Sequence, residues 1–162
     1  MREILFRAKC KAWRDLPEED WWVEGYFIKG RWYLHDKEIF AIVPIDACFY
    51  PGYQIDGWIE IDPDTLCQAI GLKDKNGKMI YEHDILKGYK FPFCHDGDFN
   101  YYGLVKWDKE YKCYYLVTVK NPESSVAGVS HGDENCFEGF NSENWEVIGN
   151  TFDNQELLKG KG

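Results

Sequence analysis

The stretch that decides the fold covers residues 58–86 and reads WIEIDPDTLCQAIGLKDKNGKMIYEHDIL. Its first half contains a helix start at Asp62 and Pro63. Asp accepts hydrogen bonds from the unpaired N–H groups of a first helical turn, and Pro lacks the donor that would be unsatisfied there. A short helix is therefore predicted over residues 63–70, with Gly71 as its left-handed C-terminal cap. An isolated helix of about two turns is unstable, so tertiary packing must hold it.

The second half of the same stretch predicts two reversals of the chain. Asn76 and Gly77 are the pair that supplies the positive φ angles of a two-residue hairpin turn. Residues 79–81 form the predicted return strand, residues 82–84 turn the chain again, and a further strand begins at residues 85–86. The whole stretch has readable backbone roles and contains no evident catalytic group.

These residues resemble the signature of the YopX family, small proteins encoded by bacteriophages and prophages. The resemblance rests on the acidic-Pro-acidic-Thr start, the run GLKDKNGK, and the Ile-Tyr-Glu and Asp-Ile segments that follow it. The opening MREILFRA and the closing WEVIGNTFDNQELL resemble the family's first strand and last segment. The family usually has Gly before the Asp-Ile pair, whereas this chain has His83, so a small change in that turn is expected. The resemblance implies a β-rich fold with an SH3-like barrel and a phage origin, and it supplies no established activity and no catalytic residues.

Strand patterns continue on both sides of this stretch. On the amino-terminal side, alternation over residues 4–10 predicts a half-buried strand. Residues 22–28 and 31–34 predict a hairpin that turns at Lys29-Gly30, and the apolar residues 39–43 predict a strand buried on both faces. Residues 16–20 are expected to form an acidic loop, and residues 48–56 a second loop.

On the carboxy-terminal side, residues 103–108 and 114–119 predict another hairpin, and residues 145–150 a closing strand. Long loops are expected over residues 88–102 and 121–135. The predicted fold class is therefore mainly β, with a short helix, amino-terminal antiparallel strands and an SH3-like barrel. The expected organisation is an amino-terminal β-hairpin region over 1–57, one compact YopX-like core over 58–158, and a flexible tail over 159–162.

Composition limits the function classes. The chain has 162 residues, enough to bury most of its apolar surface without disulfides or metals, and 17% of them are aromatic. Its formal net charge of −9 argues against a broad nucleic-acid footprint, which needs clustered Lys and Arg. No apolar run approaches the roughly eighteen residues of a membrane span, and the charged start lacks the apolar core of a secretory signal. A cytoplasmic location in a bacterial host is expected, with the six scattered cysteines reduced.

Histidines and cysteines suggest chemistry only weakly. Three of the four histidines precede Asp, at His35, His83 and His95, and the fourth is His131. A metal-dependent phosphohydrolase could use such pairs, but turns explain them better, because Asp favours turns. Zinc could use Cys94, His95, His131 and Cys136, yet no Cys-x-x-Cys pair occurs, and small buried thiols are the simpler interpretation. We expect no metal, no cofactor, no catalytic residue and no enzyme activity.

Binding is the remaining class of function. Five aromatic residues lie around the second predicted hairpin and are the candidate protein-contact surface: Tyr101, Tyr102, Trp107, Tyr114 and Tyr115. Strand alternation sends about half of such residues into the core, and the sequence does not say which half. The favoured hypothesis is an interaction module that binds a host or phage protein. A homo-oligomer of this chain is compatible with that hypothesis. The alternative is a nucleic-acid-binding accessory protein, supported by lysines on the same hairpin: Lys106, Lys109, Lys112 and Lys120. A small metal-dependent enzyme is a third class.

Overall fold

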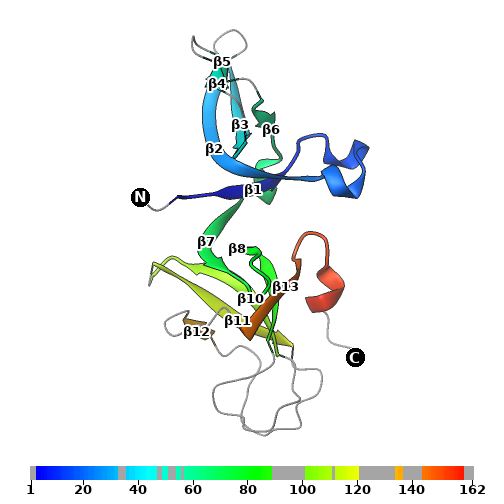
Figure 1. Cartoon of the computed structure of the whole chain (residues 1–162), viewed down its shortest axis with the longest axis vertical. Coiled ribbons are helices and arrows are strands. Elements are labelled where there is room, and N and C mark those ends of the chain that lie inside the picture. Colours follow the sequence, from blue (N-terminus) through cyan, green and yellow to red (C-terminus); the bar gives the residue numbers. More distant parts are fainter. Residues whose placement is uncertain are drawn as a thin grey trace, which may run out of the picture. The chain divides into compact units, whose positions relative to one another are not determined.

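A computed structural model describes residues 3–32, 36–46, 49–50, 54–55, 57–88, 101–110, 112–120, 134–136 and 144–158 (Figure 1). Most of these residues form antiparallel strands, and the helices with described bounds are 3-10 helices of three or four residues. The mainly-β expectation is confirmed. Among the described residues, no helix is both long enough and apolar enough to cross a membrane.

The chain divides into two compact units, Met1–Ala69 and Ile70–Gly162. The first unit contains nine elements: β1 (Phe6–Lys9), η1 (Trp13–Asp15), η2 (Glu18–Asp20), β2 (Trp22–Trp32), β3 (Lys37–Pro44), β4 (Phe49–Tyr50), β5 (Gln54–Ile55), β6 (Ile59–Glu60) and η3 (Pro63–Thr65). Strand β7 (Cys67–Lys73) contains the boundary between the units. The second unit continues with β8 (Met79–Tyr81), β9 (Asp84–Gly88), β10 (Tyr101–Asp108), β11 (Cys113–Lys120), β12 (Glu134–Cys136), β13 (Trp145–Asn150) and η5 (Gln155–Leu158).

Three sheets organise these strands. The first has the order β6-β3-β2-β1-β7-β8, the second has the order β12-β11-β10-β9-β13, and β4 pairs with β5 in a small third sheet. The described strands of the second sheet end at β12 on one side and at β13 on the other, so they form an open sheet. The SH3-like barrel is therefore not confirmed. The pair β4 and β5 also lies within residues 48–56, for which a loop was expected.

Each unit has its own apolar core. In the first unit, Ala8, Val23, Ile42 and Ile61 are buried together, with Phe6, Phe27 and Phe40 packed against them. In the second unit, the core consists of Ile70, Ile80, Leu86, Val105 and Leu116. Strand β1, predicted from its alternation, supplies Ala8 to the first core, and the predicted strands at β9 and β10 supply Leu86 and Val105 to the second.

The predicted helix over 63–70 is wrong in its extent. Its start is confirmed, because the Oδ1 atom of Asp62 accepts a hydrogen bond from the N–H of Asp64, and Pro63 begins η3. The helix ends at Thr65, however, and β7 begins at Cys67. Gly71 does adopt the left-handed conformation, with φ of 83°, but it does so inside β7 and caps no helix.

The predicted turns differ from the structure in two places. Strand β2 runs straight through Lys29-Gly30, and residue pairs from Gly25↔Pro44 to Trp32↔Lys37 join β2 to β3, so the predicted hairpin is wrong. Between β7 and β8, only Gly77 has a positive φ angle, 82°, so the two-residue turn is also wrong. Hydrogen bonds from Gly77 N–H to Asp74 O at 2.9 Å and from Asp74 N–H to Lys78 O at 2.8 Å define a longer turn. This is a type I turn followed by a left-handed glycine.

The strand predictions of the second unit are confirmed. The hairpin at residues 103–108 and 114–119 is the β10–β11 pair, and the predicted closing strand is β13, which pairs with β9. The return strand at residues 79–81 is β8. Residues 89–100, 121–133 and 159–162 lie outside the described residues, and so do most of both predicted long loops and the predicted tail. The described ends of these loops are strand, because residues 101–102 belong to β10 and residues 134–135 to β12.

Candidate functional site

The candidate aromatic surface depends on the register of β10 and β11. Trp107 pairs with Tyr114 in this ladder, two positions along from the pair of Val105 and Leu116. Because side chains two residues apart share a face of a strand, Trp107 and Tyr114 lie on the same face as these two core residues. Their ring centroids are 4.8 Å apart at an interplanar angle of 63°, an edge-to-face contact. Trp107 is nevertheless 40% exposed, whereas Tyr114 packs against the core, so Tyr114 supports an indole that reaches solvent.

Of the other three predicted aromatic residues, the ladder places Tyr115 and Tyr102 away from this pair. Tyr115 pairs with Lys106 and therefore lies on the opposite face of the sheet. Tyr102 pairs with Lys120 beyond a register shift, and its side chain is half-buried. The side chain of Tyr101 lies outside the described residues. Of the five candidates, the structure thus brings only Trp107 and Tyr114 into described ring contact.

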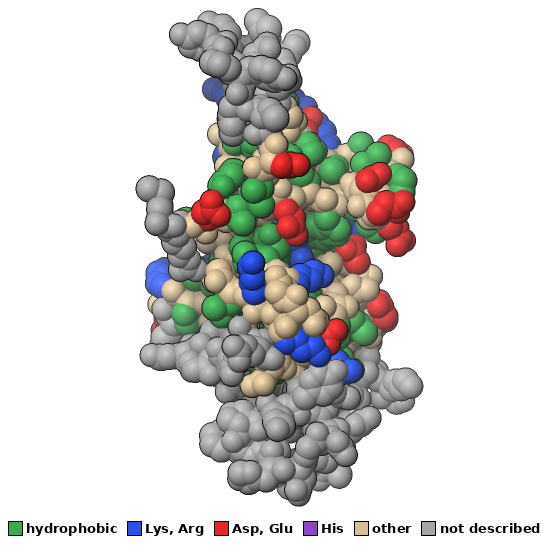
Figure 2. Space-filling model, viewed as in Figure 1, with side chains coloured by type: hydrophobic (Ala, Val, Ile, Leu, Met, Phe, Trp, Pro, Cys, Tyr) green, Lys and Arg blue, Asp and Glu red, His purple; other side chains and the backbone are tan. Residues whose placement is uncertain are grey.

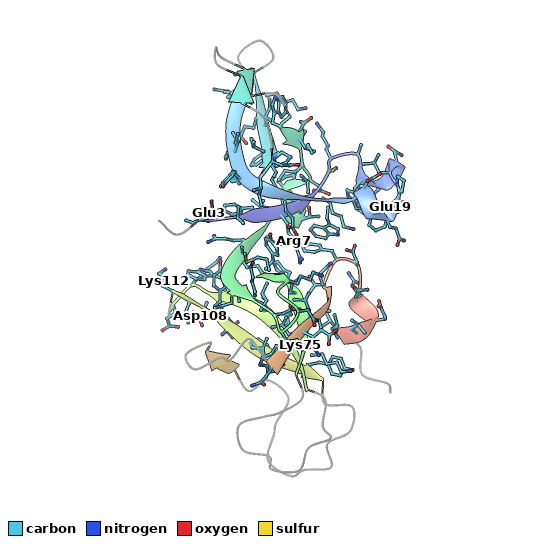
Figure 3. All side chains as sticks on the ribbon, viewed as in Figure 1. Glu3, Arg7, Glu19, Lys75, Asp108 and Lys112 are labelled. Atoms are coloured by element: carbon cyan, nitrogen blue, oxygen red, sulfur yellow. The ribbon has the colours of Figure 1, made fainter. Side chains whose placement is uncertain are left out.

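Charged residues flank Trp107 in the sequence of the hairpin, and by strand alternation Lys106 and Asp108 lie on the opposite face of the sheet. Lys106, Lys109 and Lys112 are exposed, while the side chain of Lys120 lies outside the described residues. The same hairpin contains acidic residues. In its turn, Asp108 accepts a hydrogen bond from the N–H of Glu110 at 2.7 Å. Figure 3 labels Asp108 and Lys112 on the two sides of this turn. The charges of this hairpin are therefore of both signs and do not form a purely basic surface.

The turn between β7 and β8 is built around one buried carboxylate. The carboxylate of Asp74, which is only 6% exposed, accepts hydrogen bonds from the N–H groups of Asn76, Lys78 and Val147 at 2.8, 2.9 and 3.0 Å. Burial tends to raise the pKa of Asp74, but the three N–H groups outweigh this effect and lower the pKa below its ordinary value. An ionised carboxylate thus holds the turn against β13.

A buried lysine among tryptophans was missed by the sequence analysis. Lys9 is 2% exposed, and its Nζ atom lies 3.8 Å from the ring centroid of Trp13, 4.2 Å from that of Trp21 and 5.5 Å from that of Trp22. Arg7, 6% exposed, likewise has its Cζ atom 4.9 Å from the Trp22 ring. Cation–π attraction compensates part of the loss of hydration for these charges. The concentration of tryptophans between residues 13 and 22 was the signal for this cluster, and alternation alone wrongly placed both cations in solvent.

Acidic side chains gather on the neighbouring η1–η2 segment, where Figure 2 shows them beside apolar groups. All residues from Asp15 to Asp20 are exposed. Two short 3-10 helices, rather than a plain loop, carry them. The indole N–H of Trp21 donates to Leu16 O at 2.8 Å, and this bond ties the η1–η2 segment to the Trp21 side chain.

The described histidine and cysteine residues do not converge. His83 is exposed in the β8–β9 turn, and the adjacent Asp84 is fully buried, where its Oδ2 atom accepts a hydrogen bond from the N–H of Tyr81 at 2.8 Å. This geometry supports the turn interpretation of the His-Asp pair. His35, His95, His131 and Cys94 lie outside the described residues, as does the side chain of Cys136. Within the described residues, no three His, Cys, Asp or Glu side chains are grouped as metal ligands.

The comparisons with known proteins concern the family and the fold. The profile of the YopX protein family matches residues 32–159, which is most of the chain. The chain belongs to the YopX family. Curated proteins gave no match. Among solved structures, the crystal structure of protein EF1440 from Enterococcus faecalis is similar over 98% of this chain and 100% of that chain, with 23% sequence identity and a TM-score of 0.47.

Membership of the YopX family confirms the resemblance that the central stretch suggested. The matched region contains the β7–β8 turn and the β10–β11 hairpin, so both features belong to the family's part of the chain. The difference at His83 also lies there, and the structure places His83 in the left-handed conformation with φ of 67°. A position that is usually Gly in the family is thus one where Gly is favoured on steric grounds.

Proposed function

We propose that this YopX protein is a non-catalytic interaction module that binds a host or phage protein in the bacterial cytoplasm, and that the chain is encoded by a phage or prophage. The observation that carries the proposal is the exposed indole of Trp107, held edge-to-face by Tyr114. Large aromatic side chains of limited conformational freedom are the usual anchors of protein interfaces, because they bury much apolar area with little loss of entropy.

The surroundings of Trp107 support the same function. Tyr114 packs against the core of the second unit, so the indole is supported before any partner arrives. Lys109 and Glu110 are exposed in the turn that follows β10, just beyond Trp107, and carry opposite charges. An apolar centre with a polar rim of both signs is the usual anatomy of a protein interface. Binding by Trp107 would require no rearrangement of the hairpin.

A pull-down from phage-infected host cells, with and without nuclease, tests the proposal when it is run with two variants. Trp107→Ala should lose the partner, and Trp58→Ala, which truncates an indole of similar exposure at 38%, should retain it. With the purified partner, Trp107→Ala should weaken binding by at least about 30-fold, or about 2 kcal/mol. A partner that binds both variants equally would exclude the Trp107–Tyr114 surface.

Nucleic-acid binding is a second candidate, because three exposed lysines lie on the hairpin that also presents Trp107. An exposed indole can stack on a base, and lysines can contact phosphates. Salt dependence separates the two candidates. Counterion release predicts a steep, linear fall of log affinity with log salt for a nucleic acid, whereas an interface centred on Trp107 should change little. Loss of every partner after nuclease treatment would favour the nucleic acid.

A further inference from the structure

Strand β13 lies at the edge of the second sheet, and its outer side is covered by a turn. Within the described part of the sheet, β13 pairs with β9 alone. Two backbone groups of β13 are bonded elsewhere: Trp145 O accepts from Lys75 N–H at 2.9 Å, and Val147 N–H donates to the Oδ2 atom of Asp74 at 3.0 Å. Both partners belong to residues 74–78, the turn between β7 and β8. We name these residues the edge guard.

The edge guard imitates part of a neighbouring strand. A strand added to β13 would offer one N–H donor and one carbonyl acceptor to the groups on either side of Glu146. Lys75 N–H supplies the donor, and the carboxylate of Asp74 takes the place of the carbonyl. The Lys75 ammonium also lies 2.6 Å from the Glu146 carboxylate (Figure 3 labels Lys75). The edge guard thus satisfies β13 at one point and, being a turn, offers no continuing ladder.

Hydrogen bonds within residues 74–78 fix the conformation of the edge guard, in addition to its bonds with β13. The carboxylate of Asp74 also accepts from the N–H groups of Asn76 and Lys78, and the left-handed Gly77 closes the turn. A β-branched or aromatic residue could not take that conformation without strain. Both oxygens of Asp74 are therefore committed, Oδ1 within the turn and Oδ2 to β13.

The sequence of β13 explains why a guard is needed. Edge strands usually avoid pairing with other chains by carrying Lys, Pro or several charges. In contrast, β13 reads WEVIGN, with a single charge at Glu146 that Lys75 neutralises. Trp145, Val147 and Ile148 are among the residues that favour strands. A bare β13 would therefore be a suitable template for another strand.

We propose that the edge guard prevents β13 from pairing with β13 of a second copy of this chain. A second copy is the fitting occupant because antiparallel pairing of two identical edges about a two-fold axis satisfies both with one interface. The inference is independent of the proposed binding at Trp107, which lies on β10. Removal of the Asp74 carboxylate should convert the protected edge into a self-association surface.

Sedimentation equilibrium and amide exchange test this proposal. Asp74→Ala should show a concentration-dependent rise in mass towards twice that of the wild type, and the exchange of the Val147 amide should accelerate at least tenfold in dilute solution. The double variant Asp74→Ala/Val147→Pro is the matched control. It lacks the N–H that an incoming strand would bond, and because this N–H is not bonded to β9, the variant should return to the wild-type mass.

Three results would overturn the proposal. Asp74→Ala could keep the wild-type mass at every concentration while folded, the double variant could associate as strongly as Asp74→Ala, or the Val147 amide of the folded wild type could exchange as fast as an unprotected one. Should Asp74→Ala fail to fold, Asp74→Asn retains the size and one carbonyl oxygen, and the same rise in mass and exchange rate is expected of it. The wild-type exchange measurement needs no variant.

Discussion

At the scale of single residues, His83 shows how tertiary hydrogen bonds impose an unfavourable backbone conformation. Its N–H donates to Val105 O, and its carbonyl accepts from Thr151 N–H, both at 3.0 Å. These bonds fix the β8–β9 turn from two sides, and φ of His83 is 67°. The left-handed region costs an L-residue roughly 1–2 kcal/mol, a penalty that Gly does not have. The imidazole recovers part of it by an edge-to-face contact with Phe152, at a centroid distance of 5.4 Å.

Two substitutions separate the backbone strain from the ring contact. His83→Ala removes the ring and keeps the strain, so it should lower the free energy of unfolding by about 0.5–1.5 kcal/mol. His83→Gly removes both and should be more stable than His83→Ala by about 1 kcal/mol. Urea unfolding followed by tryptophan fluorescence measures both differences. Equal stability of the two variants would show that the turn is not strained at this residue.

At the scale of elements, local chemistry predicted where structures begin better than how far they extend. The Asp62-Pro63 start is local and was predicted correctly, because one side chain caps the turn that follows it. The predicted continuation of the helix failed because residues 67–69 pair with residues 5–7 instead: Gln68 pairs with Phe6, and Ala69 N–H donates to Leu5 O at 2.8 Å. A helix of about two turns has too little stability of its own to compete with a sheet ladder.

The candidate site shows the same limit. The sequence identified the β10–β11 hairpin and its aromatic residues, but only the register decides that Trp107 faces Tyr114 and that Tyr115 points to the other side. The edge guard joins Asp74 to Val147, residues 73 positions apart, and no local pattern encodes that contact. The Lys9 cluster likewise needs β1 and the η1–η2 segment together.

Two glycines of β2 test the position of the first hairpin. At Gly25, an added Cβ would lie 2.0 Å from Val43 O, a backbone atom that cannot move aside, whereas at Gly30 nothing lies within 4 Å of it. Gly25→Ala should therefore lower the free energy of unfolding by about 1–3 kcal/mol. Gly30→Val should raise it by about 0.5–1 kcal/mol, because Gly30 lies inside a strand that Val favours.

Thermal unfolding of the two variants gives the comparison directly. Gly30→Ala is the matched control for Gly25→Ala, because it adds the same methyl group to the same strand without the clash. If the chain instead turned at Lys29-Gly30, as the sequence pattern indicated, Gly30→Val would destabilise the protein, since a β-branched residue does not suit a turn glycine. The sign of the Gly30→Val effect therefore distinguishes a continuous β2 from a hairpin.

At the scale of the whole molecule, each of the two units contains a carboxyl group whose pKa is lowered in the folded protein. In the first unit, Glu60 accepts hydrogen bonds from Lys11 at 2.6 Å and Lys37 at 3.2 Å. The bond from Lys11 lowers the pKa of Glu60 most, burial opposes it, and the bond from Lys37 lowers the pKa further. In the second unit, three N–H groups lower the pKa of Asp74 against the effect of its burial. Acid should therefore weaken both units.

The sign of the pH dependence follows from these two shifts. Because the pKa of each carboxyl is lower in the folded protein than in the unfolded chain, the folded state binds fewer protons, and both groups contribute full stability above the unfolded pKa of about 4. That contribution is lost as the pH falls through the lower folded values. The free energy of unfolding should thus be nearly constant between about pH 6 and pH 5 with respect to these groups, and should fall steadily below pH 4.

Urea titrations at a series of pH values check this expectation with variants that cannot ionise. In solutions dilute enough for Asp74→Asn to remain monomeric, Glu60→Gln and Asp74→Asn should each be less stable than the wild type at pH 6 and should each lose less stability on acidification. The larger flattening is expected for Asp74→Asn because its carboxylate is the more buried. Glu38→Gln is the matched control, since Glu38 pairs with Lys29 at 3.3 Å with its side chain 61% exposed, and such pairs contribute little. An acid slope unchanged in both Glu60→Gln and Asp74→Asn would mean that other carboxylates cause acid unfolding.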